Sequence, residues 1–121
     1  MKTNAKHLSK ESQDPEHKLY EAFTLINTAE EAKEFLTDLC TPAEIDAMTG
    51  RFRVVPLIKQ GKSYQKIHAE TGVSITTIGR VARFLTLGEG GYNKIYERLA
   101  DKLNEKQKQI KNRDPKKRTL K

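Results

Sequence analysis

The sequence predicts an all-α protein, and three observations along its 121 residues agree on this. Signals that start helices recur at Asp14, Thr28, Thr41, Ser63 and Ser74. Behind each of them, apolar residues are spaced three or four positions apart, as on one face of a helix. Only 36% of the residues are hydrophobic and Trp is absent, so one copy alone would bury a thin core. We therefore expect a small helical domain that a second copy completes.

The compartment is predicted from what the sequence lacks. The single Cys40 cannot form an internal disulfide, and its neighbours show no metal-ligand spacing, so we expect a packing residue in a reducing compartment. The first residues hold no apolar signal region, and no apolar run approaches the roughly 20 residues that a membrane span needs. We expect a soluble cytoplasmic protein.

Charge is divided unevenly along the chain, whose net charge is +7. Residues 1–50 hold five Lys and ten Asp or Glu, whereas residues 51–85 hold seven Lys or Arg and one Glu. Residues 101–121 hold nine basic and three acidic residues. Segregated positive charge favours an anionic partner, because neutralised phosphates release counterions. A solvated basic face would have the same composition, so charge alone does not decide.

The first two helices are predicted from their starts. The segment DPE at 14–16 combines a capping side chain, a proline at the first helical position and an acid in the first turn, so we expect a helix over 15–27. Its apolar face carries Leu19, Phe23 and Ile26. The segment TAEE at 28–31 is a capping box and starts a second helix. That helix carries Phe35, Leu36 and Leu39.

A second capping box, TPAE at 41–44, starts the third helix, whose apolar spacing continues to Ile58 and should end at Gly61. Pro56 lies inside this pattern and removes one backbone donor. The helix either kinks near residue 55 or divides there. We favour a kink, because the apolar spacing continues across the proline.

Residues 63–86 predict a helix-turn-helix. Ser63 caps a short helix that ends at Thr71, Gly72 supplies a left-handed residue, and Ser74 caps the next helix. The second helix should carry Ile75, Ile78, Val81 and Leu85 inward. We expect Ile67, Val73, Ile78 and Val81 to meet in one small core where the two helices cross.

The outward face of the second helix has the chemistry for DNA. A helix that enters the major groove with its N-terminus presents threonines and arginines to base edges, and its capped start favours phosphate oxygens. The residues that we expect to bind DNA are Lys62, Gln65, Lys66, His68, Ser74, Ile75, Thr76, Thr77, Gly79, Arg80 and Arg83. A helical hairpin with solubilising threonines and arginines is the alternative.

Beyond this unit the sequence predicts a linker, one more helix and a tail. GEGG at 88–91 lacks the lysine and the strand of a nucleotide-binding loop and indicates a linker. The final amphipathic helix carries Tyr92, Ile95, Leu99 and Leu103. Residues 106–121 are basic and interrupted by proline, which predicts disorder and serves either solubility or nonspecific attraction to DNA. The expected parts are a flexible arm (1–13), a helical domain (14–105) and a disordered tail (106–121).

The motifs LCTPAEIDAM, QGKSYQKIHAETGVSITTIGRVARFL and GGY, taken together, resemble the Trp repressor superfamily, most closely its YerC/YecD-like branch. The resemblance covers about residues 16–100. It implies an intertwined, all-helical homodimer in which the apolar faces at 19–26, 35–39, 45–58 and 92–103 pack between chains. It also implies a regulator of transcription, with repression the expected direction. The second helices of the two helix-turn-helix motifs, one from each copy, would lie about one DNA turn apart, roughly 34 Å, on a palindromic operator.

The resemblance further implies a candidate effector pocket. In the Trp repressor two arginines bound the tryptophan site, and the matching positions here are Arg51 and Arg80. Where tryptophan-binding members have a glycine and a serine, this chain has Val81 and Phe84, which would fill the space of the indole. We do not expect tryptophan to bind, whereas a different small-molecule effector stays open.

Other function classes have less support in the sequence. No nucleophile-base pair, paired carboxylates or cofactor fingerprint stands out, so we expect neither an enzyme nor a cofactor. His68 has no second ligand three or four residues away, so we expect no metal site. The main rival is an RNA-binding or nonspecific nucleic-acid-binding basic protein, and a helical interaction module is a second.

Overall fold

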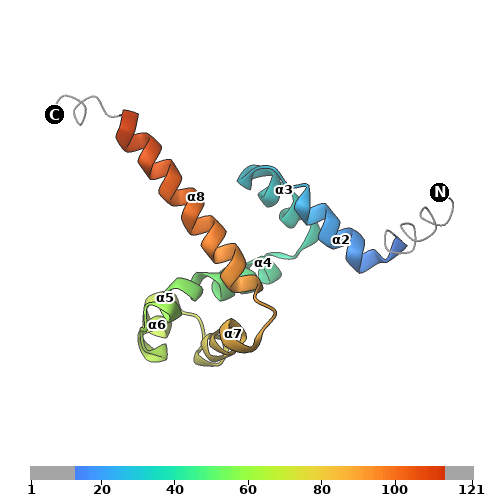
Figure 1. Ribbon diagram of the computed structural model, residues 1–121. Coiled ribbons are helices and arrows are strands. Elements are labelled where there is room, and N and C mark those ends of the chain that lie inside the picture. The colour runs from blue at the N-terminus through green and yellow to red at the C-terminus, as the bar shows by residue number, and fades with distance from the viewer. Residues whose placement is uncertain (1–12, 114–121) are drawn as a thin grey trace. The chain divides into compact units, whose positions relative to one another are not determined.

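The computed structural model describes residues 13–113, and every regular element in this range is a helix (Figure 1). The helices are α2 (Pro15–Thr24), α3 (Ala29–Leu39), α4 (Pro42–Arg53), α5 (Val55–Lys59), α6 (Tyr64–Thr71), α7 (Ile75–Leu87) and α8 (Gly91–Arg113). The predicted all-α class is confirmed. None of the described helices has both the length and the apolar character that a membrane span requires. The chain forms two compact units, which meet in sequence between Ile45 and Asp46.

The first unit contains α2 and α3, and both helices begin where the sequence predicts. The Asp14 carboxylate accepts the His17 amide at 3.3 Å, and the Thr28 hydroxyl accepts the Glu31 amide at 3.1 Å. The rings of Phe23 and Phe35 meet edge to face, with centroids 5.6 Å apart. None of the residues of either helix is fully buried. The unit therefore has no interior of its own.

The end of α2 differs from the prediction. The sequence predicts helix to residue 27, but α2 ends at Thr24. The amides of Leu25 and Ile26 bond back three residues, to the carbonyls of Ala22 and Phe23. Such short-range bonds tighten the last turn of a helix. The chain is then free to extend into the Thr28 cap.

The start of α4 is a complete capping box. The Thr41 hydroxyl accepts the Glu44 amide at 3.1 Å, and the Glu44 carboxylate accepts the Thr41 amide at 2.8 Å. The backbone hydrogen bond from Thr41, followed by the bond to its side chain, lowers the pKa of Glu44 below its ordinary value. The box satisfies two of the backbone donors that a helix start leaves unpaired.

The expected kink at Pro56 is wrong, because the helix divides there instead. Helix α4 ends at Arg53, Val54 forms a turn, and α5 begins at Val55 with the proline in its first turn. Pro56 has no amide hydrogen for the carbonyl four residues earlier, whereas a first-turn position needs none. A new helix start therefore accommodates the proline better than a bent helix interior.

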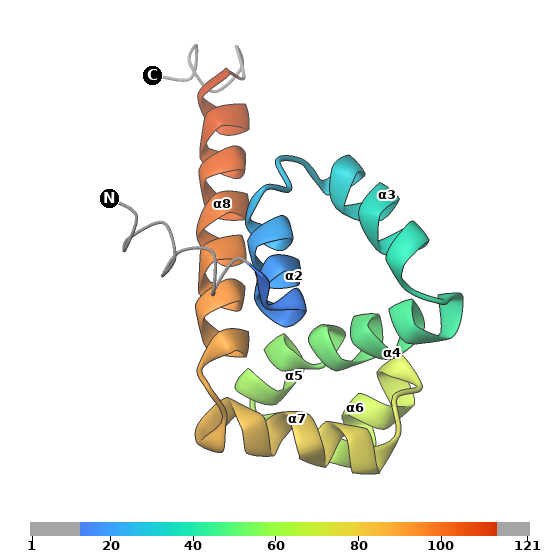
Figure 2. The same cartoon turned by 90° about the vertical axis from the view of Figure 1, so that its right-hand side faces the viewer.

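The second unit has a small core built around the helix-turn-helix. Its fully buried residues are Val54, Val55, Ile67, Ile78 and Val81. Phe52, Val73 and Leu85 pack against them, together with Tyr92 and Tyr96 of α8. Helices α6 and α7 lie against each other, with α5 beside them, in both views (Figures 1 and 2). The packing of this core fixes the orientation of α7 relative to the other helices of the second unit.

The turn between α6 and α7 has the predicted form. Gly72 adopts φ +76°, the left-handed conformation that favours glycine, and its amide bonds to the His68 carbonyl at 2.8 Å. Helix α4 approaches this turn closely, since a Cβ atom added to Gly50 would lie 3.3 Å from Cγ2 of Val73. The turn is thus held from within α6 and from α4.

The last helix is longer than predicted. The sequence predicts a disordered tail from residue 106, but α8 continues to Arg113. Lysine, glutamine and glutamate are good helix formers, and no proline interrupts the chain before Pro115. The predicted tail is wrong for residues 106–113. The predicted arm at 1–12 and the tail at 114–121 lie outside the described residues, and a single domain over 14–105 stays a prediction.

Candidate nucleic-acid interface

The joint between α6 and α7 is fixed by side chains that bond to the backbone. Ser63 caps α6 by accepting the Lys66 amide at 3.2 Å. The Thr71 hydroxyl donates to the Ile67 carbonyl at 2.7 Å and accepts the Val73 amide at 3.1 Å. The Nδ1 of His68 lies 2.7 Å from the Val73 carbonyl oxygen, which can only accept, so this nitrogen carries the hydrogen.

Ser74 and Thr77 form a small network at the start of α7. The Ser74 hydroxyl accepts the Thr77 amide at 3.1 Å and donates to the Thr77 hydroxyl at 2.9 Å. Thr77 is half-buried, whereas Thr76 is exposed and its hydroxyl makes no hydrogen bond with the rest of the described chain. Thr77 therefore supports the cap, and Thr76 is the threonine that faces outward.

A groove runs along the exposed face of α7. It has a volume of about 630 Å³ and is lined by Thr76, Gly79, Arg80, Arg83, Phe84 and Leu87. Arg80 lies over the ring of Phe84, with its guanidinium carbon 5.1 Å from the ring centroid. Neither Arg80 nor Arg83 forms an ion pair with any residue of the described chain. Guanidinium donors on one wall of the groove are thus open to a ligand.

The residues expected on the first helix of the motif lie in three different settings. Gln65 and Lys66 are exposed in the first turn of α6. Lys62 is half-buried and paired with Glu70, its Nζ lying 3.0 and 3.1 Å from the two carboxylate oxygens. His68 is exposed but bonded to the turn through Nδ1. Lys62 and His68 are therefore committed to the fold of the motif.

Two expected positions differ in the structure. Ile75 is 42% exposed and lies outside the core, so its expected inward packing is wrong, while its place in the first turn of α7 agrees with the expected DNA-facing set. Val81 lies fully in the core and lines neither hollow beside α7, so its place beside an effector pocket stays a prediction. The geometric reason is helical spacing, because Val81 shares the inward face with Ile78.

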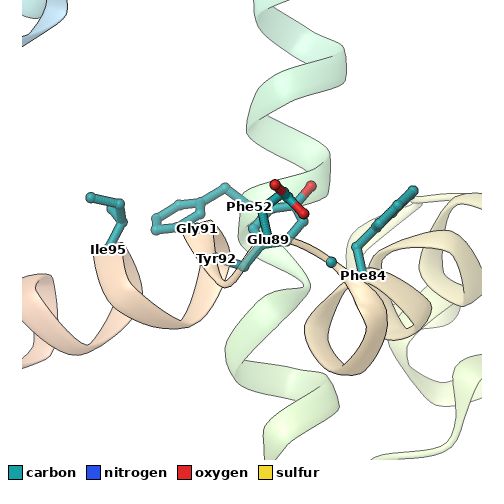
Figure 3. Close-up of a pocket in the computed structure, with 7 residues that line it drawn as sticks. Phe52, Phe84, Glu89, Gly91, Tyr92 and Ile95 are labelled. Carbon is teal, nitrogen blue, oxygen red and sulfur yellow. The ribbon is translucent and has the colours of Figure 1, made fainter. Parts of the chain in front are cut away.

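The expected effector residues are not gathered in one cavity. Arg51 is exposed on α4 and lines neither the α7 groove nor the hollow beside α8, whereas Arg80 and Phe84 line the α7 groove. A separate apolar hollow of about 440 Å³ lies beside α8 (Figure 3). Phe52, Phe84, Tyr92 and Ile95 form its apolar wall, and Glu89 stands at its edge. Phe84 thus borders two hollows.

Two residues near the motif were missed by the sequence reasoning. Leu87 lines the α7 groove, four residues after Arg83 on the same face, and helical spacing would have found it. Arg53 donates to the Thr71 carbonyl at 3.5 Å and so joins α4 to the end of α6. No pattern in the sequence predicts this long-range bond. Among the described residues, no three potential metal ligands gather in one place.

The sequence of this helical unit matches a known family. The model of the Trp repressor protein family matches residues 16–100, well over half of the chain. The chain belongs to the Trp repressor family. The resemblance inferred from the sequence motifs is therefore confirmed. Membership of this family indicates a DNA-binding regulator.

Three individual proteins agree with the assignment. YerC of Bacillus subtilis is 35% identical over 83 residues, which cover 69% of this chain and 80% of YerC. A TrpR-like protein from Eubacterium eligens superposes with a TM-score of 0.68 at 34% identity, covering 76% of this chain and 95% of that one. A candidate Trp repressor from Staphylococcus aureus superposes with a TM-score of 0.65 at 38% identity, covering 69% and 83%. The fold of the Trp repressor family is thus shared along most of the chain.

Proposed function

We propose that this protein is a transcriptional regulator that binds double-stranded DNA in a sequence-selective way, with repression as the expected direction. The observation that carries the proposal is the outward face of α7. Its start is capped by Ser74, and Thr76, Arg80 and Arg83 line one groove behind that cap. A capped helix start attracts phosphate, while threonine and arginine side chains can contact base edges in the major groove.

Charge supports the same assignment. Residues 51–85 hold seven Lys or Arg against one Glu, and that Glu70 is paired with Lys62. Six basic residues of this segment are therefore left without a carboxylate partner in the described chain. Cationic side chains around a reading helix supply affinity for the phosphate backbone, which positions the helix without specifying sequence.

We further propose that the chain acts as a homodimer on a palindromic operator. Large apolar side chains are exposed in both units, including Phe23, Leu39, Ile95, Leu99 and Leu103. Exposed apolar faces of this extent are typical of association surfaces. Two copies would present two α7 helices, and half-sites about one DNA turn apart would follow from the symmetry.

Tryptophan is not part of the proposal. The position that follows Arg80 is the buried Val81, and Phe84 covers the groove beside Arg80 with a large ring. The proposal leaves room for a different small-molecule effector, but it does not require one for DNA binding. The basis is that Ile78 and Val81 already fix α7 in the core, so its outward face is presented without a ligand.

The class of nucleic acid is tested by comparing duplex DNA, duplex RNA and single-stranded RNA of one base composition. Fluorescence anisotropy at several salt concentrations should give the tightest binding to duplex DNA, with a log–log salt slope of about −0.9 per phosphate contact. Arg83→Ala should weaken binding to duplex DNA and reduce that slope. Equal or tighter binding to RNA would instead support the basic RNA-binding alternative.

A further inference from the structure

Phe84 occupies an unusual place for a large aromatic residue. It is 40% exposed on the surface of the second unit, and it belongs to the walls of both the apolar hollow and the α7 groove. The hollow is also lined by Phe52 from α4 and by Tyr92 and Ile95 from α8 (Figure 3). Phe84 therefore lies between the apolar hollow and the groove that Arg80 lines.

The contact between Arg80 and Phe84 orders the arginine without using its donors. The guanidinium carbon lies 5.1 Å from the ring centroid, four residues along the same helix. A guanidinium that stacks on an aromatic face keeps its N–H donors at its edges, where they can reach a base or a phosphate. A free arginine side chain loses conformational freedom when it binds, whereas a stacked one has lost part of it already.

We propose that Phe84 is a positioning residue for Arg80. The ring holds the guanidinium over the groove in the orientation that reads DNA, so the selectivity of α7 depends on an aromatic ring at position 84. This inference rests on the proposed function, because it assigns Phe84 a role in the same DNA-binding face. It goes beyond that function by making a residue that does not itself need to touch DNA a determinant of specificity.

The inference requires the aromatic face of Phe84 and not only its apolar volume. Phe84→Leu keeps an apolar side chain in the lining of the hollow but removes the π face that the guanidinium contacts. Phe84→Tyr keeps the ring and serves as the matched control. A residue that only fills space would be replaced adequately by leucine, whereas a residue that orders a cation would not.

A double-mutant cycle on DNA affinity separates these roles. The five proteins are the wild type, Phe84→Leu, Phe84→Tyr, Arg80→Ala and the Phe84→Leu/Arg80→Ala double variant, each titrated at fixed salt with the duplex that the wild type selects. Phe84→Leu should weaken binding about two- to ten-fold for each α7 helix, the scale of the conformational freedom that one long side chain loses when it is ordered only on binding. Phe84→Tyr should stay close to the wild type. In the Arg80→Ala background, Phe84→Leu should have no further effect.

A structural readout accompanies the cycle. Protons of the Arg80 side chain should show ring-current shifts in the NMR spectrum of the wild type and of Phe84→Tyr, and these shifts should vanish in Phe84→Leu. Circular dichroism establishes that each variant is folded. A weakening by Phe84→Leu that is the same with and without Arg80 would overturn the inference, as would full affinity of Phe84→Leu. A wild type that selects no duplex would refute the proposed function itself, and the inference with it.

Discussion

The Ser74 hydroxyl makes two hydrogen bonds at the start of α7: it accepts the Thr77 amide and donates to the Thr77 hydroxyl. Ser74→Ala removes both. Loss of an N-cap should lower the free energy of unfolding by about 0.5–2 kcal/mol, measured by urea denaturation. Ser74→Asn keeps a capping acceptor and is the control that should lose less. A Ser74→Ala protein as stable as the wild type would show that the cap does not stabilise α7.

Glu44 in the capping box of α4 should make a contribution to stability that depends on pH. Its folded pKa is depressed, chiefly by the backbone hydrogen bond from Thr41, so its stabilising effect is present above the pKa of the unfolded glutamate. This effect is lost as the pH falls through the lower folded pKa. Glu44→Gln should therefore be less stable than the wild type at neutral pH, and the difference should shrink as acid protonates Glu44. A difference that does not change with pH would contradict the charge-based explanation.

At the scale of elements, the sequence predicts where helices begin better than where they end. Each predicted start depends on one side chain that accepts the backbone amide three residues ahead. All five are found where predicted, at Asp14, Thr28, Thr41, Ser63 and Ser74. Ends depend on competition between segments. Helix α2 ends before the cap of the next helix, and α4 ends where Pro56 starts a new helix. Helix α8 continues because no proline interrupts it before Pro115.

The interface could be predicted only in part, for a similar reason. Helical spacing places Thr76, Arg80 and Arg83 on one face, and the structure brings them to one groove. Spacing within α7 does not reveal that Lys62 pairs with Glu70 eight residues away, or that His68 bonds across the turn. Such contacts depend on the path of the chain just before and just after α6, which spacing within one helix does not give.

The bond from His68 to the Val73 carbonyl gives an element-scale prediction. His68→Phe removes the only donor that reaches this carbonyl from α6 while keeping a ring of similar shape. Stability should fall by about 0.5–1.5 kcal/mol, and amides at the start of α7 should exchange hydrogen faster in NMR experiments. His68→Asn can restore part of the protection, because its amide is a donor. Unchanged exchange in His68→Phe would mean that the bond does not hold the turn.

Many large apolar side chains are exposed in both units of the described chain. The second unit buries five apolar residues completely, and the first unit buries none within α2 and α3. Apolar residues also line α8 at Ile95, Leu99 and Leu103, all of them at least 41% exposed. Patterning along one chain reveals these faces, but it cannot reveal what covers them. A second copy is the partner that we propose.

Association with a second copy predicts stability that depends on concentration. The melting temperature of the full chain should rise with protein concentration, because only the folded state associates. Leu99→Lys should lower it and favour the monomer in sedimentation experiments. Asn104→Lys places the same charge on another side of α8 and should have little effect. A melting temperature that is independent of concentration, with monomeric sedimentation, would contradict the homodimer.

The central claim is that α7 reads the sequence of duplex DNA. Its most direct test is selection of binding duplexes from a randomised pool at near-physiological salt, with the full chain and no added ligand. The account predicts a recovered palindrome with half-sites about one helical turn apart, and loss of its enrichment when Arg80→Ala replaces the wild type. A bound pool without any common sequence, equally retained by Arg80→Ala, would contradict it.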